Sequence, residues 1–159
     1  MVLGLFVIIQ FVPYGRDHSN PPVVAEPAWD SPTTRELSVR SCFDCHSNET
    51  KWAWYSNIAP LSWLIQNHVE EGREELNFSE WHLDHEGEEA AETVRDGSMP
   101  TRGYLLMHSE ARLSDVELSA LVSGLATTLG DEGNGENDEG QSERDDADEH
   151  DDDAHEGDD

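Results

Sequence analysis

The chain contains two cysteines, and they lie three positions apart with a histidine directly after the second. Cys42, Cys45 and His46 form the sequence CFDCH. Three chemistries use a cluster of this kind: a zinc site, a redox-active dithiol and the covalent attachment of haem. Each would require a different fold around the motif, so the rest of the sequence has to decide among them.

Zinc and dithiol chemistry are both disfavoured by what surrounds the motif. A structural zinc site normally takes four protein ligands, mostly cysteine and histidine, but there is no second cysteine pair, and His82 and His85 lie in a loose acidic stretch. A thioredoxin-type dithiol lies at a helix start after a strand, where the helix dipole lowers the pKa of the thiol. Here the pair comes at the end of a predicted helix, without a strand–helix–strand pattern around it.

Covalent attachment of haem agrees best with the motif. Two thiols one helical turn apart can each add to a vinyl group of the porphyrin, and the adjacent histidine can then bind the iron from the same side. We therefore expect one haem c held by Cys42 and Cys45, with His46 as an axial ligand. The reaction requires reduced thiols outside the cytoplasm.

A second axial ligand is predicted in the sequence GSMP. Methionine is a common ligand of electron-transfer haems because its thioether raises the reduction potential. Met99 stands directly before Pro100, which favours an extended backbone at Met99. His68, on a predicted apolar helix face, is the alternative ligand.

Hydrophobic periodicity predicts an all-α fold. Ser31 and Pro32 provide an N-cap and a first helical residue, and Ser114 with Glu117 forms a capping box. Gly97 is suited to end a helix. No segment alternates as a strand would. The helices are expected at about 31–42, 60–76, 86–95 and 114–130. A domain of this size has a modest core, which a large flat cofactor would complete.

The two ends of the chain differ from its middle. Residues 1–13 are almost entirely apolar, too short to span the bilayer as a helix, and resemble a signal or anchor segment without a charged flank or cleavage site. We therefore expect a membrane tether, with the domain at 14–130 in the cell envelope, outside the cytoplasmic membrane. Residues 131–159 hold 16 Asp or Glu and one Arg, and such a composition predicts a disordered acidic tail.

The overall charge excludes one class of partner. The formal net charge is −27, and residues 1–130 carry 20 acidic against 8 basic side chains. Nucleic acid is not an expected partner, because its phosphates would be repelled.

Side chains near the motif are candidates for the haem surroundings. Aromatic rings can pack against a porphyrin, and indole or phenol groups can donate to a propionate, as can an arginine. The candidates are Trp52, Trp54, Tyr55 and Arg102, with Trp63 and Arg73 as further ones.

Several stretches resemble a known family. GSMP followed by LSDVELSALVSGL is similar to the C-terminal part of small class I cytochromes c. PYGRDHSNPP, the long stretch from CFDCHSNETKWAWYS to ELNFSEW, and YLLMHSEARLS look like the bacterial haem-binding domain family, whose members are membrane-tethered and have one Cys-x-x-Cys-His. The resemblance implies one covalent haem c on Cys42 and Cys45, with His46 as axial ligand. Members often have proline where Ala53 and Thr101 stand.

Electron transfer is the function that these features predict. With His46 and Met99 on the iron there is no open position for a substrate, so we expect a mono-haem electron carrier with a redox protein partner and no enzymatic activity. The alternative is a haem domain with a weak or open sixth position that senses a gas or reacts with peroxide. An interaction protein without haem, built on the acidic tail, is a more distant alternative.

Overall fold

The computed structural model is all-helical, as the sequence predicts. It describes residues 1–81, 87 and 89–130. Within these ranges the chain forms no strand, and a single parallel bridge joins Ala25 to Glu80. The helices are α1 (Val2–Ile9), α2 (Pro32–Ser41), α3 (Phe43–His46), α4 (Leu61–Glu75), α5 (Ala90–Arg95), α6 (Arg102–Met107) and α7 (Asp115–Leu129), with 3₁₀ turns η1 (Trp54–Asn57) and η2 (Ser109–Ala111).

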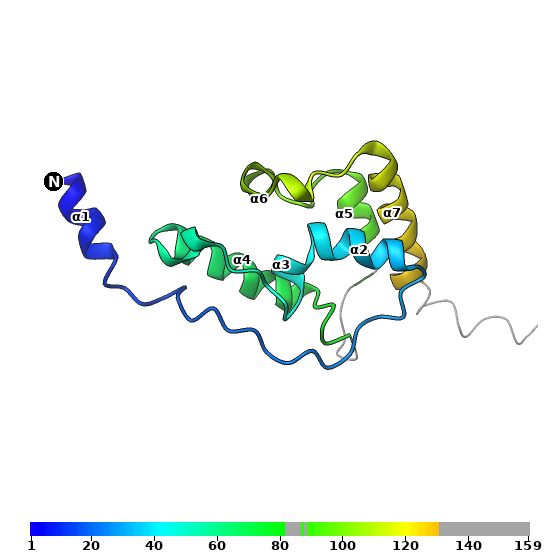
Figure 1. Cartoon of the computed structure of the whole chain (residues 1–159), viewed down its shortest axis with the longest axis horizontal. Coiled ribbons are helices and arrows are strands. Elements are labelled where there is room, and N and C mark those ends of the chain that lie inside the picture. Colours follow the sequence, from blue (N-terminus) through cyan, green and yellow to red (C-terminus); the bar gives the residue numbers. More distant parts are fainter. Residues whose placement is uncertain (82–86, 88, 131–159) are drawn as a thin grey trace, which may run out of the picture.

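The hydrophobic core occupies one end of the molecule. Figure 1 shows α2, α5 and α7 grouped at this end, with α4 and α6 extending away from it. Helices α4 and α6 reach beyond the core, and Leu64 of α4 and Leu106 of α6 are exposed. The core is made by Leu37, Phe43, Leu76, Phe78, Ala91, Val94, Leu121, Leu125 and Leu129.

The expected helices form where their end signals stand. The Ser31 hydroxyl accepts a hydrogen bond from the Thr34 amide (3.2 Å) before α2, and Ser114 and Glu117 form the capping box of α7. Gly97 has a φ of 77°, the left-handed conformation that ends α5. The predicted start of α5 near residue 86 lies outside the described residues.

Two short helices were not predicted from hydrophobic periodicity. α3 has four residues and α6 has six, so neither completes the two turns over which an apolar face repeats. Both belong to the region that carries the candidate ligands. α3 contains Cys45 and His46, and α6 begins three residues after Met99.

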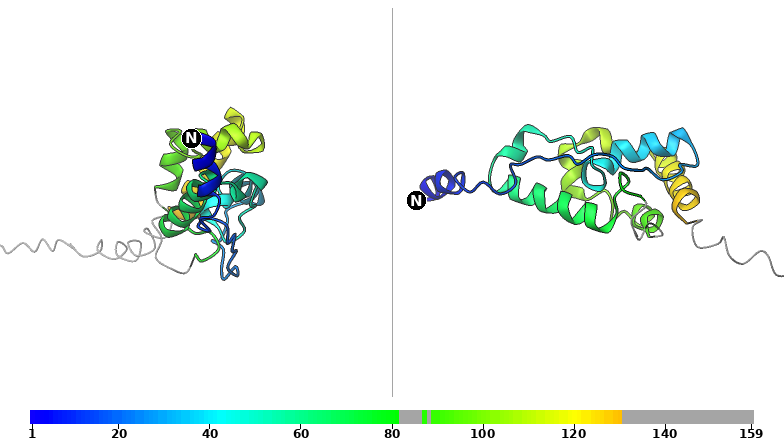
Figure 2. Two further views of the ribbon diagram at one scale, coloured as in Figure 1. Left: turned by 90° about the vertical axis from the view of Figure 1, so that its left-hand side faces the viewer. Right: turned by 90° about the horizontal axis from the view of Figure 1, so that it is seen from below.

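The segment between α1 and α2 runs along one side of the molecule without helical structure, as Figures 1 and 2 show. Gly15 lies so close to the backbone of Ser62 in α4 that a side chain has no room. The ring of His18 stacks on Trp52 at 4.5 Å between centroids. The segment is therefore packed on the domain along its length.

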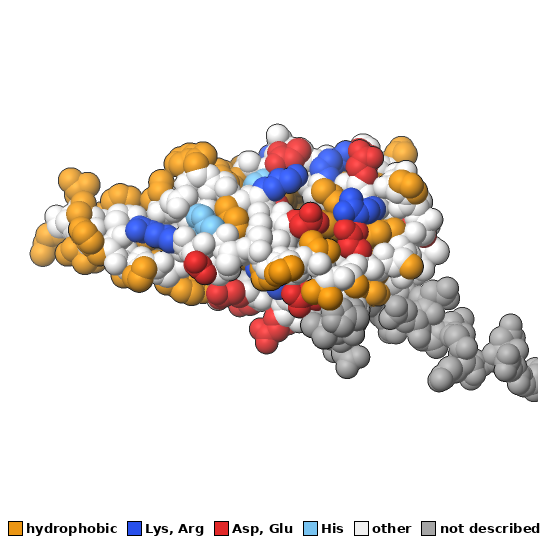
Figure 3. Space-filling model, turned by 60° about the horizontal axis from the view of Figure 1, so that its bottom comes forward, with side chains coloured by type: hydrophobic (Ala, Val, Ile, Leu, Met, Phe, Trp, Pro, Cys, Tyr) orange, Lys and Arg blue, Asp and Glu red, His pale blue; other side chains and the backbone are white. Residues whose placement is uncertain are grey.

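The apolar N-terminal segment forms α1, and none of its residues is buried. In Figure 3 hydrophobic side chains gather at this end of the molecule. Over the described part of the chain, no helix has the length and apolar character needed to cross a membrane. The predicted disorder of residues 131–159 concerns a range outside the described residues.

Candidate functional site

The Cys-x-x-Cys-His motif forms a single helical turn. Cys42 ends α2 with its amide bonded to the Ser38 carbonyl (2.8 Å), and its own carbonyl accepts from the amides of Cys45 (3.1 Å) and His46 (3.0 Å). Residues i, i+3 and i+4 share one face of a helix. The two thiols and the imidazole therefore lie on the same face, while Phe43 is buried in the core.

The imidazole of His46 is held by one of its two nitrogens. Nδ1 lies 2.8 Å from the Gly72 carbonyl oxygen and 3.1 Å from the Leu76 carbonyl oxygen. Because both partners are acceptors, Nδ1 carries the proton and donates. Among the described residues, Nε2 has no hydrogen-bond partner. A neutral imidazole fixed in this way presents the lone pair of Nε2 to a metal.

Burial favours this neutral form. The pKa of His46 is lowered from its usual value, mainly because burial penalises the charged imidazolium, although the carbonyls of Leu76 and Gly72 oppose the shift. The ring therefore has its lone pair available at neutral pH.

Gly72 is what allows α4 to approach the motif. A Cβ at this position would lie 2.7 Å from the carbonyl oxygen and 3.0 Å from the Cβ of Cys45. Without a side chain, Gly72 brings its carbonyl within reach of His46. Helix α4 thus contributes an acceptor to the site and not only packing.

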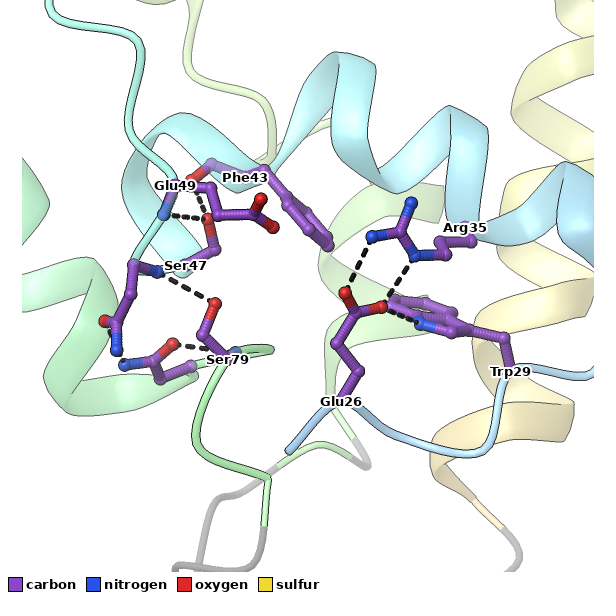
Figure 4. A network of polar contacts seen from close by, with 9 residues as sticks. Glu26, Trp29, Arg35, Phe43, Ser47, Glu49 and Ser79 are labelled. Atoms are coloured by element: carbon purple, nitrogen blue, oxygen red, sulfur yellow. Dashed lines mark hydrogen bonds and ion pairs between the residues drawn. The ribbon is translucent and has the colours of Figure 1, made fainter. Parts of the chain in front are cut away.

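A buried polar network fixes the chain directly after His46, part of which Figure 4 shows. The amide of Asn48 donates to the Ser79 hydroxyl (3.0 Å), and the amide of Ser79 donates to Asn77 Oδ1 (2.9 Å). Asn77 also donates through Nδ2 to Asn48 Oδ1 (3.0 Å). The network joins the residues following α3 to those following α4, so His46 is held from two sides.

A second cluster in Figure 4 ties the N-terminal segment to the motif region. Glu26 forms an ion pair with Arg35 of α2 (2.6 Å) and accepts from the indole of Trp29 (2.8 Å). Arg35 also lies over the ring of Phe43, 5.8 Å from its centroid. The N-terminal segment is therefore anchored next to the helical turn of the motif.

The two thiols are free and protonated at neutral pH. Burial raises the pKa of Cys42 to about 11. It raises the pKa of Cys45 to about 11 as well, with contributions from Asp44 and Cys42. A catalytic dithiol needs the opposite shift, because the thiolate is the attacking form. The described residues also contain no group of three or more His, Cys, Asp or Glu that could hold a metal ion.

Two of the residues predicted to surround the haem form hydrogen bonds with other parts of the protein. The guanidinium of Arg73 donates to the Ser47 carbonyl (2.8 Å) and the Thr50 hydroxyl (3.0 Å), so it already has partners in the protein. The indole of Trp52 donates to Asn20 (3.2 Å). Trp52 thus helps to fix the N-terminal segment, and so does Arg73 through further bonds to the Ser19 carbonyl (3.4 Å) and Asn20 (3.1 Å).

Two other residues predicted to surround the haem are exposed to solvent. Trp54 is 74% exposed, and Arg102 is also exposed. Trp63 has a buried indole nitrogen for which the structure gives no hydrogen-bond partner. Trp54 belongs to a wider group of exposed large apolar side chains on η1, α4 and α6, whose other members are Leu61, Leu64, Leu106 and Met107.

The two candidates for the second axial ligand are accessible. Met99 is 39% exposed and lies between α5 and α6, where its amide binds the Thr93 carbonyl (3.0 Å). His68 lies on the exposed side of α4, next to Leu64, whereas Val69 and Leu76 are buried. The apolar stripe predicted for this helix is thus divided into a packed part and an uncovered part.

A cluster that sequence reasoning missed joins α6 to the motif. The hydroxyl of Tyr104 donates to Oδ2 of Asp44 (2.8 Å), which stands between the two cysteines. The Tyr104 ring stacks on His108 at 4.1 Å, and Tyr55 lies 2.7 Å from Nε2 of His108. The spacing of Tyr104 and His108, four residues apart, was a signal for one shared helix face. No sequence signal indicated their partners Asp44 and Tyr55, which lie 60 and 53 residues away in the chain.

Comparison with known proteins adds one finding. The model of the haem-binding domain family matches residues 4–127, which is most of the chain and includes the motif, Met99 and α6. Neither the curated proteins nor the solved structures gave a significant match.

Proposed function

We propose that this chain, which belongs to the haem-binding domain family, is a mono-haem c-type cytochrome domain that transfers electrons outside the cytoplasmic membrane. Family membership supports haem binding. The proposal adds that a single haem is attached through thioethers to Cys42 and Cys45, that His46 binds its iron, and that the domain carries electrons without being an enzyme.

The state of His46 is the observation that carries the proposal. Its Nδ1 proton is given to the carbonyls of Gly72 and Leu76, which leaves Nε2 with its lone pair and no partner among the described residues. Carbonyl acceptors behind a ligand histidine fix its tautomer and orientation and raise its basicity. Nε2 is not among the fully buried polar atoms of the described residues, so a ligand can reach its lone pair.

The uncovered apolar side chains also fit a haem. Single exposed leucines are common on protein surfaces, but several large apolar side chains are exposed on η1, α4 and α6, among them Leu64 at 51% and Leu106 at 75%. The end of α6 is linked to η1 through His108 and Tyr55, and η1 packs on α4, so these elements belong to one region. A porphyrin would bury much of this surface.

The second axial ligand is proposed to be Met99. The bound haem supplies a one-electron couple. His46 and Met99 would both bind the iron, so that no bond would have to form or break when the electron moves. The thioether of Met99 also favours the reduced state more than an imidazole would.

The cell envelope is the proposed location. Haem c attachment takes place outside the cytoplasm, and the apolar residues of α1, all unburied, are suited to associate with a membrane. Tethering by this segment is part of the proposal. The redox partner would be a protein.

Attachment is tested by denaturing electrophoresis of the protein made in a host that matures cytochromes c. The unmutated protein should keep haem peroxidase staining, and changing both Cys42 and Cys45 to Ala should remove it. The matched control is Ser41→Ala, which changes a hydroxyl next to the motif but leaves both thiols. Absence of staining from the matured, unmutated protein would refute covalent attachment.

The iron ligand is tested by spectroscopy. The oxidised protein should show the weak far-red charge-transfer band of a sulfur–iron bond, and Met99→Ala should abolish it, lower the reduction potential and allow carbon monoxide to bind the reduced protein. Val116→Ala is the control, because Val116 is an exposed apolar residue of α7, a helix that, among the described elements, does not pack on α4 or α6. If the band is absent before mutation and His68→Ala opens the iron instead, His68 is the ligand.

One observation favours the sensor alternative. Met99 is not part of the hydrophobic core, so displacing its thioether from the iron would not require the core to unfold. Rapid binding of carbon monoxide to the unmutated, reduced protein would support a sensor and contradict the electron carrier.

A further inference from the structure

Helix α6 makes few packing contacts with the rest of the domain. None of its residues is buried, and among the described elements it packs closely only on η2, the next turn of the chain. Helices in proteins are normally stabilised by burying an apolar face. Apart from the proposed haem, side-chain contacts within the protein therefore fix where α6 lies.

Besides the bond from Arg112 to the Leu105 carbonyl of α6 (3.0 Å), two aromatic residues make these contacts. Tyr104 donates its hydroxyl to Asp44 of α3 (2.8 Å), and the side chain of His108 accepts from or donates to Tyr55 of η1 (2.7 Å). The two rings are nearly parallel, 12° apart, at a centroid distance of 4.1 Å. Tyr104 and His108 thus act as one unit that connects the end of α6 to two other elements.

The attachment point lies inside the Cys-x-x-Cys-His motif. Asp44 uses Oδ2 for Tyr104 and Oδ1 for the amide of Lys51 (3.0 Å). Both oxygens are therefore engaged, and the carboxylate is fixed relative to the helical turn of the motif. A hydrogen bond to a carboxylate is stronger than one between neutral groups.

The start of α6, opposite the end that carries Tyr104 and His108, follows directly after the Met99 segment. Met99 is followed by Pro100 and Thr101, and α6 begins at Arg102. The amide of Met99 donates a hydrogen bond to the Thr93 carbonyl of α5 (3.0 Å). A shift of α6 would therefore be transmitted to Met99 over three residues.

We infer that Tyr104 and His108 are positioning residues that fix the Met99 segment relative to the motif through Asp44 and Tyr55. They do not touch the iron. They keep the thioether close enough to remain bound, and so determine how readily another ligand can replace it. This inference rests on the proposed role of Met99.

The test uses the haem-loaded protein with Tyr104→Phe, which removes the hydroxyl and keeps the ring stacked on His108. Loss of the bond to a carboxylate should raise the population with Met99 dissociated about tenfold. Carbon monoxide should then bind the reduced protein about tenfold faster, and the far-red band should weaken. Tyr55→Phe should act in the same direction from the other end of the unit.

Tyr14→Phe is the matched control. Tyr14 also donates its hydroxyl to a carboxylate, that of Glu70 (2.9 Å), but it lies in the N-terminal segment. The rate of carbon monoxide binding to the reduced Tyr14→Phe protein should equal that of the unmutated protein. Hydrogen exchange of the α6 amides gives a second readout that needs no reaction at the iron. Exchange should be faster in Tyr104→Phe and unchanged in Tyr14→Phe.

The outcomes separate the two proposals. If the unmutated protein has haem but lacks the far-red band, the role of Met99 fails and this inference fails with it. If the band is present, and Tyr104→Phe and Tyr55→Phe keep their haem and behave like Tyr14→Phe in rate and exchange, only the positioning role is refuted. Faster binding and faster exchange in both variants would support it.

Discussion

Replacing Gly72 with alanine tests the close approach of α4 to the motif. Two effects oppose each other. Alanine is better than glycine inside a helix by about 1 kcal/mol. However, the new Cβ would lie 2.7 Å from the carbonyl oxygen and 3.1 Å from the carbonyl carbon of Cys45. Both are backbone atoms, so α3 or α4 must move, and overpacking of this kind costs about 1–3 kcal/mol.

The expected net result is a loss of about 1 kcal/mol in the free energy of unfolding, or a decrease of roughly 5 °C in the melting temperature for a domain of this size. The same movement would lengthen the hydrogen bond from His46 to the Gly72 carbonyl, now 2.8 Å. A weaker bond makes the imidazole a poorer donor to iron. The reduction potential of the haem-loaded protein should therefore rise.

The assay is urea unfolding of the haem-loaded protein followed by circular dichroism, together with a redox titration. Gly103→Ala is the control, because Gly103 also lies in a helix and a Cβ there would meet nothing within 4 Å. It should leave the stability unchanged or raise it slightly. The reasoning is refuted if Gly72→Ala is as stable as Gly103→Ala and has an unchanged potential.

Three other predictions concern the rest of the fold. Gly124→Ala should lower the melting temperature by several degrees, measured by circular dichroism, because its Cβ would collide with Thr34 where α7 crosses α2. For Glu117, whose pKa is lowered to about 2 mainly by the Ser114 amide and also by Arg40, the stabilisation is complete above the unfolded value near 4.5 and lost as pH falls towards 2. Glu117→Gln should therefore lower the melting temperature more at pH 6 than at pH 3, by an amount reduced because the carboxylate is exposed to solvent, and an equal difference at both would contradict this. A chain ending at Gly130 should keep its haem staining and melting temperature, because residues 131–159 have little to bury, and a clear decrease would show that they pack on the domain.

The sequence by itself determined the features that depend on neighbouring residues. Ser31 with Pro32 begins α2, and Ser114 with Glu117 begins α7. The family was also recognisable from short motifs, and the family model now covers residues 4–127. The two cap signals lie within a few positions of the helices that they begin, so local chemistry was sufficient to predict them, whereas the family came from the resemblance of several stretches of the chain.

The tertiary structure alone decided how the motif is held. That Gly72 and Leu76 orient His46 depends on where α4 crosses α3, and that Asp44 anchors Tyr104 depends on a contact across 60 residues. The same applies to Arg73, a candidate for a propionate, which instead bonds Ser47 and Thr50. Side chains of these types have several partners that would satisfy them equally well, and only the packed arrangement of the helices selects one, because it fixes which donors and acceptors come within hydrogen-bonding distance.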